Sequence, residues 1–345
     1  MTNPPTVMAA LEAAIAASEQ VVGTTSPNPP VGAAILSAEG ELVGVGATQP
    51  PGGPHAEVMA LRAAGERARG GTAVVTLEPC HHVGRTGPCS HALLGAGIRT
   101  LYYAHEDATP PAAGGAEWLR QQGMEVHRLD VEVPTLRPWL RAMALGRPHV
   151  TLKCAQTLDG FTAAPDGTSQ WITGLEARAW VHRDRARRDA IIIGTGTALA
   201  DNPSLTARTP EGELLERQPR RVVIGRRSLD PERTSNLHRL GFEQYDSPAA
   251  ALAALWEEGA RDVLVDGGAG LLTSFLEEGL ADALQVYVAP LLLGEGRGTL
   301  CRPLARTLAE ATRLHQRSLH QVGEDILWEL TLDRDEERNP ACSPE

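Results

Sequence analysis

The sequence predicts an α/β protein composed of two domains, and two observations lead to this expectation. The chain has 345 residues, more than a single hydrophobic core normally holds. Short apolar segments also alternate with segments of helical spacing along its length. Because a Gly-Arg-Pro break at residues 146–148 interrupts this alternation, we expect one domain over residues 1–146, a second over 147–335 and a disordered tail over 336–345.

The first half begins with an alanine-rich helix at residues 7–20, followed by strands at 31–36 and 42–47 around a glycine turn. A helix from His55 to Arg69 ends at two glycines, which suit a helix C-terminus. The compact apolar run at 72–77 predicts a strand. The pattern continues with a helix at 89–96, a strand at 99–104, a helix at 115–122, a strand at 125–130 and a helix at 132–145.

The second half shows the same alternation. Residues 158–170 are rich in Gly, Pro and Asp and predict a loop, and the glycines at 194–196 predict a turn. We expect strands at 150–155, 189–193, 221–225, 262–266 and 283–289, helices at 175–188, 248–258 and 270–278, and a terminal pair of strands within 308–333.

The bulk composition excludes several classes of protein. A formal net charge of −11 argues against nonspecific binding to nucleic acid, which requires a broad basic surface. No apolar window approaches the length that spans a bilayer, and the first residues lack the features of a signal peptide. Five cysteines without disulfide-like spacing indicate reduced thiols in a cytoplasmic protein. Among them we expect Cys154, Cys301 and Cys342 to be inert, the first two in apolar surroundings.

The most informative motif contains one histidine, two cysteines and one further carboxylate. His55 and Glu57 stand two residues apart, Cys80 follows Glu78-Pro79, and Cys89 lies downstream. An imidazole and two thiolates fill three corners of a tetrahedral Zn²⁺ site and leave the fourth to water, whose pKa zinc lowers toward neutrality. Glu57 is the expected catalytic residue, which takes the proton of that water and delivers it to the substrate. The set predicts a zinc-dependent deaminase.

Eight residues separate the two cysteines, and they bring imidazoles, an arginine and a flexible glycine to the rim of the site. Together with residues 24–32, this spacing resembles the deaminase half of the bifunctional riboflavin-pathway deaminase/reductase family, whose usual Thr-Pro-Pro-Cys is here Thr86-Gly87-Pro88-Cys89. The resemblance implies a cytidine-deaminase-like αβα domain and substrate contacts by Asn28 and His82. On local grounds alone, Asn28 suits a Pro-rich turn and His82 could cap a turn.

Residues 152–160, 169–174 and 196–208 resemble the reductase half of the same family, so that the resemblance spans roughly residues 5–330. It implies a dihydrofolate-reductase-like α/β domain that uses NADPH. Residues 268–271 follow an apolar strand and open a helix, where backbone amides can hold a phosphate. Carried over to matching positions, cofactor binding falls on Ala155, Trp171, Thr197, Asp201, Gly268, Ala269, Gly270 and Leu271, and substrate binding on Ser169, Arg185, Leu205, Arg208 and Asp266.

Two positions depart from the family pattern. Asp266 stands where the family usually has glutamate, and its carboxylate is shorter by one methylene, which leaves room for a bridging water. Gly225 and Arg226 replace the usual aspartate and small hydroxyl residue, and we hypothesise that Arg226 meets the 2′-phosphate of NADPH. Lys153 and Asp159 form either a structural pair or part of the reductase pocket. Of the arginines at 183, 185, 187 and 188, we expect most on a solvated helix face.

We therefore expect a bifunctional riboflavin-pathway enzyme with Zn²⁺ and NADPH as cofactors. The first reaction removes ammonia from a 2,5-diamino-6-ribosylamino-pyrimidinone 5′-phosphate, and the second reduces the ribosyl side chain to ribityl. The expected partner is this small phosphorylated pyrimidine, with no nucleic acid and no membrane, and the family suggests a homodimer or larger oligomer. The alternatives are a nucleic-acid base deaminase fused to a nucleotide-binding module, a zinc-stabilised binding protein without catalysis, and a chain with one active half.

Overall fold

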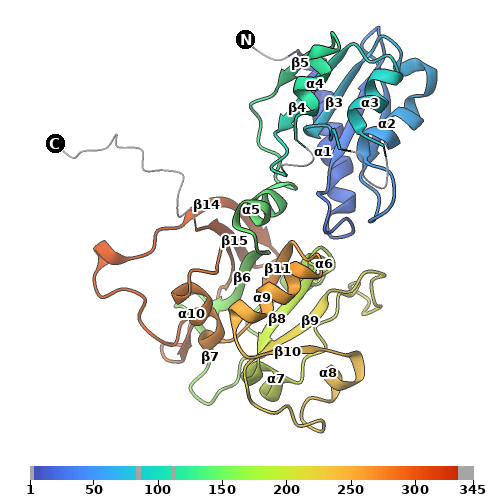
Figure 1. Cartoon of the computed structure of the whole chain (residues 1–345). Helices are drawn as coiled ribbons and strands as arrows, with labels where there is room; N and C mark the ends of the chain where they lie inside the picture. The colour runs from blue at the N-terminus through green and yellow to red at the C-terminus, as the bar shows by residue number, and fades with distance from the viewer. Residues whose placement is uncertain (1–3, 83–86, 110–112, 333–345) are drawn as a thin grey trace, which may run out of the picture. The chain divides into compact units, whose positions relative to one another are not determined.

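Residues 4–82, 87–109 and 113–332 are described by a computed structural model, which divides into two compact units, Met1–Pro148 and His149–Glu345. Each unit combines a β-sheet with packed helices, so the expected α/β fold class is confirmed (Figure 1). The tail expected at 336–345 and residues 83–86 between the two cysteines lie outside the described residues. Within the described ranges, no helix is both long and apolar enough to cross a bilayer.

The first unit is built on a five-stranded sheet in the order β2-β1-β3-β4-β5. β1 pairs antiparallel with β2 and with β3, whereas β3, β4 and β5 are parallel. The elements are α1 (Pro5–Val21), β1 (Gly32–Leu36), β2 (Leu42–Ala47), α2 (Ala56–Ala64), the 3₁₀ turn η1 (Gly65–Ala68), β3 (Thr72–Leu77), α3 (Cys89–Gly95), β4 (Thr100–His105), α4 (Gly115–Gln121), β5 (Glu125–Arg128) and α5 (Arg137–Leu145).

Glycines let two helices pack closely on opposite faces of this sheet. A Cβ on Gly32 of β1 would clash with the carbonyl oxygen of Ala14 in α1, and one on Gly46 of β2 would clash with the backbone of Ala60 in α2. Gly46 pairs with Ala33, the neighbour of Gly32, and adjacent residues of a strand face opposite sides. Helices α1 and α2 therefore cover different faces, and the apolar core of the unit lies against both.

The helix expected at 132–145 begins later, at Arg137. Upstream of it, the amide of Val133 donates a hydrogen bond to Nε2 of His105 at 3.1 Å, which ties that segment to the end of β4. Pro138 lies in the first turn of α5, where a missing N–H costs nothing. The tertiary contact at Val133 thus prevails over the helical spacing of the sequence.

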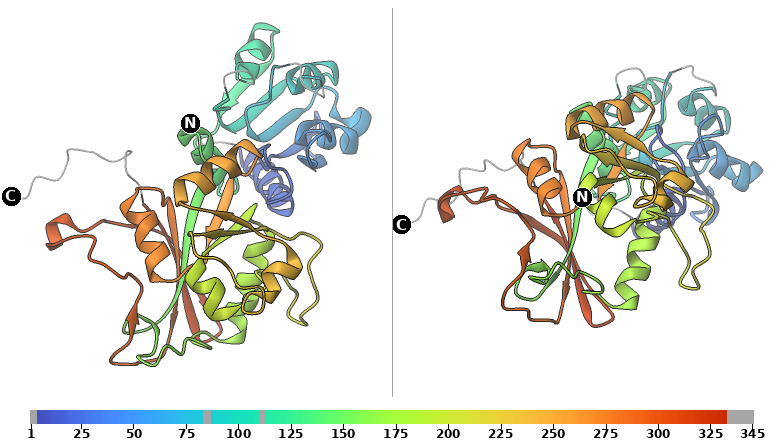
Figure 2. Two further views of the ribbon diagram at one scale, coloured as in Figure 1. Left: turned by 60° about the horizontal axis from the view of Figure 1, so that its bottom comes forward. Right: turned by 90° about the horizontal axis from the view of Figure 1, so that it is seen from below.

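The second unit contains an eight-stranded sheet in the order β10-β9-β8-β11-β6-β12-β15-β14, with a separate pair β13-β7. Strands from β10 to β12 are parallel, and β15 and β14 are antiparallel additions at one edge (Figure 2). Its elements are β6 (His149–Thr157), β7 (Phe161–Ala163), α6 (Leu175–Ala186), β8 (Ala190–Gly194), α7 (Thr195–Asp201), β9 (Arg220–Ile224), α8 (Ser235–Leu240), β10 (Glu243–Tyr245), α9 (Pro248–Glu257), β11 (Asp262–Val265), α10 (Ala269–Glu277), β12 (Ala283–Ala289), β13 (Arg297–Gly298), η2 (Leu308–Glu310), β14 (His315–Val322) and β15 (Asp325–Thr331).

Several short elements of this unit were not expected. β7 lies inside the expected loop, α7 begins at the expected glycine turn, and α8 and β10 carry no sequence signal that we identified. α7 was missed because Gly194 serves as its N-cap and Gly196 lies in its first turn, and glycine disfavours helix interiors. Tertiary packing therefore stabilises these short elements, which the local sequence alone does not favour.

The two faces of the larger sheet carry separate apolar cores. Ile192 of β8 packs with residues of α9 and α10, whereas its neighbour Ile191 packs with residues of α7 and α8. Helices on both faces leave a crevice at the carboxyl ends of the parallel strands, which is the usual place of a ligand site in an α/β sheet.

Candidate functional site

Three loops of the first unit converge at one edge of its sheet. Gly32, the first residue of β1, pairs with Ala47, the last residue of β2, and Ala33 pairs with Val75 near the end of β3. The chain before β1, after β2 and after β3 must therefore lie at the same edge, because these pairings are antiparallel. These segments contain Asn28, His55 and Cys80 respectively.

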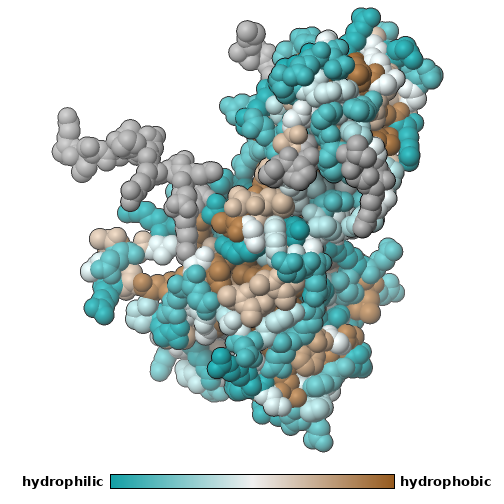
Figure 3. Space-filling view, viewed as in Figure 1, coloured by the Kyte–Doolittle hydropathy of each residue, from teal (hydrophilic) through white to brown (hydrophobic). Residues whose placement is uncertain are grey.

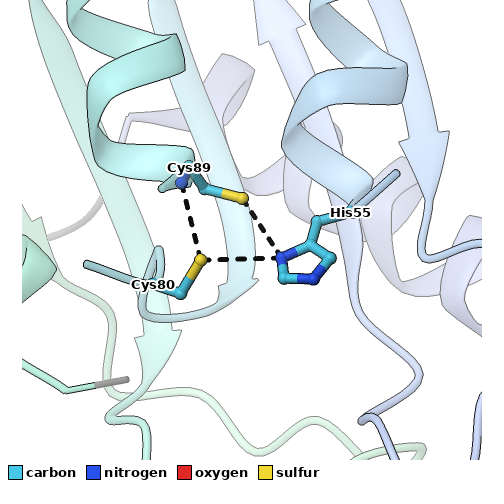
Figure 4. A group of neighbouring side chains, drawn as sticks. All are labelled: His55, Cys80 and Cys89. Carbon is cyan, nitrogen blue, oxygen red and sulfur yellow. Dashed lines mark hydrogen bonds between the residues drawn. The ribbon is translucent and has the colours of Figure 1, made fainter. Parts of the chain in front are cut away.

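The predicted metal ligands meet at this edge (Figure 4). The Nδ1 atom of His55 lies 3.6 Å from Sγ of Cys80 and 3.3 Å from Sγ of Cys89. Typical Zn–N and Zn–S bonds at a tetrahedral angle place nitrogen and sulfur about 3.6 Å apart. A hydrogen bond from the Cys89 thiol holds the pKa of Cys80 well below that of a free thiol, which favours the thiolate that binds a metal. Donor types and spacing therefore fit Zn²⁺.

Glu57 lies beside these ligands without joining them. His55 is the N-cap of α2, and Glu57, a residue that is only 4% exposed, belongs to the first turn of that helix. Burial, together with the nearby Cys80, raises the pKa of Glu57 to about 7. The cluster of ligand atoms within 4.8 Å of one another comprises His55, Cys80 and Cys89 but not this carboxylate. A buried, unligated acid next to a metal site is the arrangement that proton transfer requires.

Glu78 holds the segment that carries Cys80, a role that the sequence did not reveal. Its carboxylate accepts hydrogen bonds from the backbone amides of Asp107 at 3.3 Å, Gly114 at 3.2 Å and Ala116 at 2.9 Å. A Cβ on Gly115 would clash with the carbonyl oxygen of Pro79. The start of α4 is thus closed onto the Glu78-Pro79-Cys80 segment, and glycine is required for that close approach.

A second link joins the residues that follow the two cysteines. Nδ1 of His81 lies 2.9 Å from Oγ of Ser90, and the His81 ring stacks on Trp118. His82 differs, because its Nδ1 is buried and has no hydrogen-bond partner among the described residues. Asn28 lies in the turn before β1, where its backbone N–H donates a hydrogen bond to the carbonyl oxygen of Thr25 at 2.8 Å. The stacked His81 is structural, whereas the buried nitrogen of His82 has a hydrogen bond to offer to a ligand.

The second unit contains a cleft of about 1260 Å³ at the carboxyl ends of β6, β8 and β11. This volume accommodates a dinucleotide and a small substrate together. All predicted reductase residues line it, namely Ala155, Ser169, Trp171, Arg185, Thr197, Asp201, Leu205, Arg208, Asp266, Gly268, Ala269, Gly270 and Leu271. Residues that are up to 116 positions apart in the chain thus share one cavity.

Asp266 binds two cations directly in this cleft. Its Oδ1 lies 3.1 Å from Nζ of Lys153, and its Oδ2 lies 2.7 Å from Nη2 of Arg185. Although burial raises the pKa of the Asp266 carboxyl, Lys153 and Arg185 hold it well below the ordinary value. Asp159 is not the partner of Lys153, because its carboxylate accepts from the amides of the segment after β12 instead. Of the two alternatives for Lys153, the pocket position is the one observed.

Two backbone turns approach each other at the same cleft. The amide of Gly268 donates to Oγ1 of Thr197 at 3.3 Å, which joins the start of α10 to the first turn of α7. Gly268 is the N-cap of α10, so the first amides of that helix have no intrahelical acceptors. Such amides suit the pyrophosphate of NADPH.

Two expectations about side chains were wrong. Arg188 is buried rather than solvated, because it forms ion pairs with Asp184 and Asp262 at 2.9 Å each. Arg183 and Arg187 are exposed as expected. Cys301 is exposed rather than in apolar surroundings, whereas Cys154 is buried. Cys342 lies outside the described residues.

Comparisons with known proteins match both halves of the chain. The family model of the RibD C-terminal domain matches residues 148–328, and that of the cytidine and deoxycytidylate deaminase zinc-binding region matches residues 6–105. The riboflavin biosynthesis protein RibD of Corynebacterium ammoniagenes is 59% identical over 324 residues, which cover 92% of this chain and 96% of that protein. RibD of Mycobacterium tuberculosis is 44% identical over 327 residues, with 93% and 96% covered.

Solved structures agree with this similarity. RibD of Acinetobacter baumannii superposes with a TM-score of 0.85 at 36% identity and covers 95% of this chain and 99% of its own. A diaminohydroxyphosphoribosylaminopyrimidine deaminase/5-amino-6-(5-phosphoribosylamino)uracil reductase from Thermotoga maritima gives a TM-score of 0.82 at 30% identity, with 95% and 99% covered. The likeness therefore extends over both units.

Proposed function

The chain belongs to the RibD family of riboflavin biosynthesis proteins, and from this premise we propose which of its residues carry the two reactions. It is a bifunctional enzyme that joins a zinc-dependent pyrimidine deaminase to an NADPH-dependent reductase. We assign the deaminase to residues 1–146 and the reductase to 147–335. The observation that carries the assignment is the His-Cys-Cys cluster beside a buried glutamate, in a chain whose second unit holds a cleft of about 1260 Å³.

In the deaminase centre, His55, Cys80 and Cys89 hold Zn²⁺ and Glu57 moves protons. A zinc ion held there would lower the pKa of a water molecule and so supply hydroxide as the nucleophile for the amine-bearing carbon of the pyrimidine at neutral pH. The Glu57 carboxylate would accept one proton from that water and pass it to the ring nitrogen. It would then accept a second proton from the hydroxyl added to the carbon and pass it to the amine, which leaves as ammonia. The start of α2 supports this division of roles, because His55 precedes the helix and Glu57 lies in its buried first turn. Asn28 and His82 hold the substrate at the rim.

In the reductase cleft, the chain's residues position two ligands. NADPH, when bound, would supply a hydride to C1′ of the ribosyl group, which we propose to be in its ring-opened imine form, and the imine nitrogen would take up a proton from solvent. Positioning and electrostatics carry much of this step. We assign the nicotinamide cofactor to Ala155, Trp171, Thr197, Asp201 and the turn of Gly268, Ala269, Gly270 and Leu271, and the phosphorylated substrate to Ser169, Arg185, Leu205, Arg208 and Asp266.

Incubation with the diaminopyrimidinone ribosylamine phosphate, with and without NADPH, tests both assignments. We expect ammonia without NADPH, and loss of NADPH absorbance once the deaminated product has formed. Glu57→Gln should lower ammonia release by roughly 10²-fold or more, keep its zinc, and still reduce substrate that was deaminated beforehand. Full ammonia release by Glu57→Gln would refute the catalytic role of this carboxylate.

The same experiment separates the alternatives. Ammonia release without NADPH consumption would mean that only the deaminase half is active, and the reverse result would leave only the reductase. A nucleic-acid deaminase is not favoured, because the RibD relatives match both halves and the net charge is −11. A zinc-stabilised binding protein needs no free carboxylate beside the metal, and here Glu57 occupies that position.

We further propose that the protein forms a homodimer or larger oligomer in the cytoplasm. Support for self-association comes from the β14–β15 hairpin at the sheet edge, where Leu319, Ile326 and Trp328 are 40–55% exposed. Apolar side chains are visible on the surface of the second unit (Figure 3). The free thiols of Cys154 and Cys301, which are not part of the metal cluster, support a reducing compartment. Light scattering of the purified protein tests the oligomeric state, and a monomer would refute it.

A further inference from the structure

NADPH differs from NADH by one phosphate on the adenosine 2′-oxygen, and an enzyme that selects NADPH needs a cation for it. Lys153 and Arg185 in the cleft are both paired with Asp266. Arg208 donates to Oγ1 of Thr206 and to the carbonyl of Gly212. The guanidinium of Arg178 lies over the ring of Trp171, 4.1 Å from its centre. These four cations therefore have other partners.

Arg227 stands apart from this group. It lies after β9 and lines the cleft, and its Nε donates a hydrogen bond to Oγ1 of Thr195 at 3.0 Å. A Cβ on Gly196 would lie 3.1 Å from Nη2 of Arg227, so the guanidinium lies directly over the glycine turn at the start of α7. Within the described residues, Arg227 forms no ion pair with a carboxylate. A guanidinium has five N–H donors, and one bond to Thr195 leaves others for a phosphate.

The turn that carries Arg227 is held in place by its neighbours. Gly225 has φ +128°, and a Cβ there would lie 2.9 Å from Oγ1 of Thr195. Nε2 of Gln244 donates to the carbonyl oxygens of both Gly225 and Arg227, at 2.6 and 2.9 Å. The glycine that departs from the family pattern therefore lets the backbone approach Thr195 and direct Arg227 into the cleft.

Arg226 occupies a different environment. Its side chain is 83% exposed, does not line the cleft, and pairs with Asp246 at 3.5 Å. Asp246 does line the cleft, and its pairing with Arg226 offsets a negative charge that would otherwise oppose an anionic ligand. The 2′-phosphate role that the sequence suggested for Arg226 therefore suits its neighbour better.

Arg227 also lies close to the turn that we assign to the cofactor pyrophosphate. Thr195, its hydrogen-bond partner, and Thr197, the partner of the Gly268 amide, belong to the same turn of α7. A cofactor with its pyrophosphate at Gly268 would thus extend its adenosine half along α7 toward the guanidinium. We propose that Arg227 binds the 2′-phosphate of NADPH and sets the preference for NADPH over NADH; this inference rests on the reductase assignment above.

Calorimetric titration of the full-length protein with 2′,5′-ADP and with 5′-AMP tests the proposal without any turnover. We expect the unmodified protein to bind 2′,5′-ADP more tightly than 5′-AMP. Arg227→Gln should weaken 2′,5′-ADP binding roughly 10- to 100-fold, the range of a charged hydrogen bond, and leave 5′-AMP within about twofold. Arg227→Lys should restore part of the difference, and the control Arg226→Gln should change neither affinity.

Kinetics provide an independent readout in the same variants. Arg227→Gln should raise the KM for NADPH with little change in kcat, and leave the kinetics with NADH and the rate of ammonia release unchanged. Three results would overturn the proposal. The unmodified protein could bind 2′,5′-ADP and 5′-AMP equally, the Arg227→Gln variant could keep the preference for NADPH, or the Arg226→Gln variant could lose that preference. Failure of the reductase assignment would appear separately, as absent NADPH consumption by the unmodified protein.

Discussion

The carboxylate of Glu78 accepts a hydrogen bond from the backbone amide of Ala116 at 2.9 Å, across 38 residues of chain. Two further amides donate to the same carboxylate. Since Cys80 lies two residues after Glu78, the start of α4 fixes the position of a metal ligand through this acid. Hydrogen bonds of this kind, which orient a metal ligand, typically raise the affinity for the metal although the bonded groups do not contact the ion.

Glu78→Gln should weaken zinc binding roughly 10- to 100-fold, because the amide NH₂ cannot accept from the backbone donors that the carboxylate oxygens now bind. Competition with a chromophoric chelator measures the affinity. The exposed Glu41, which pairs with Arg67 on the same unit, provides the control Glu41→Gln with unchanged zinc affinity. Equal affinities in both variants would contradict the positioning role.

Asp266→Asn should lower reductase kcat/KM by roughly 10-fold or more, because Lys153 and Arg185 lose the anion that holds them. Asp266→Glu, which restores the usual family residue, should stay within a few-fold of the unmodified enzyme. Ammonia release measures whether the first unit is intact and should not change in either variant. Full reductase activity of Asp266→Asn would show that this carboxylate is dispensable.

Asp262→Asn should destabilise the second unit at neutral pH. Burial raises the pKa of the Asp262 carboxyl, but Arg188 and His149 outweigh it, so the pKa in the folded state is lowered. The charge therefore stabilises the fold above the unfolded-state pKa of about 3.9, and this contribution is lost as the pH falls through the lower folded-state value. The expected cost of the substitution is about 3 kcal/mol at pH 7 and smaller below about pH 4.

Urea unfolding followed by hydrogen exchange in peptides of the second unit measures this cost at several pH values. Glu277→Gln, which breaks an exposed pair with Arg302, is the matched control and should cost under about 1 kcal/mol. A destabilisation by Asp262→Asn that does not change with pH would argue that its packing, and not its charge, matters.

Much of the fold was predictable because the strongest signals are local. The strands at 72–77 and 283–289 have the predicted bounds, since each is a mostly apolar run between clear breaks. The start of α5 and the existence of α7 were not predictable, because a hydrogen bond to His105 and packing in the cleft decide them. Such contacts join distant residues and leave no periodic pattern.

In the site, too, local signals were predictable from the sequence and long-range contacts were not. The types and spacing of His55, Cys80 and Cys89 identified a zinc centre, because few chemistries use that combination. The acceptor role of Glu78 was missed, since its donors are backbone amides that any residue supplies. Arg188 was expected in solvent because its helix is rich in charge, yet Asp262, 74 residues away, pairs with it in the interior.

Zinc K-edge X-ray absorption of the purified protein, with and without Glu57→Gln, tests the central claim most directly. We predict one zinc per chain, two sulfur ligands at about 2.3 Å and two nitrogen or oxygen ligands at about 2.0–2.1 Å. We also predict the same spectrum for Glu57→Gln, because this carboxylate does not bind the metal. Substoichiometric zinc, or the loss of an oxygen ligand in the variant, would contradict the account.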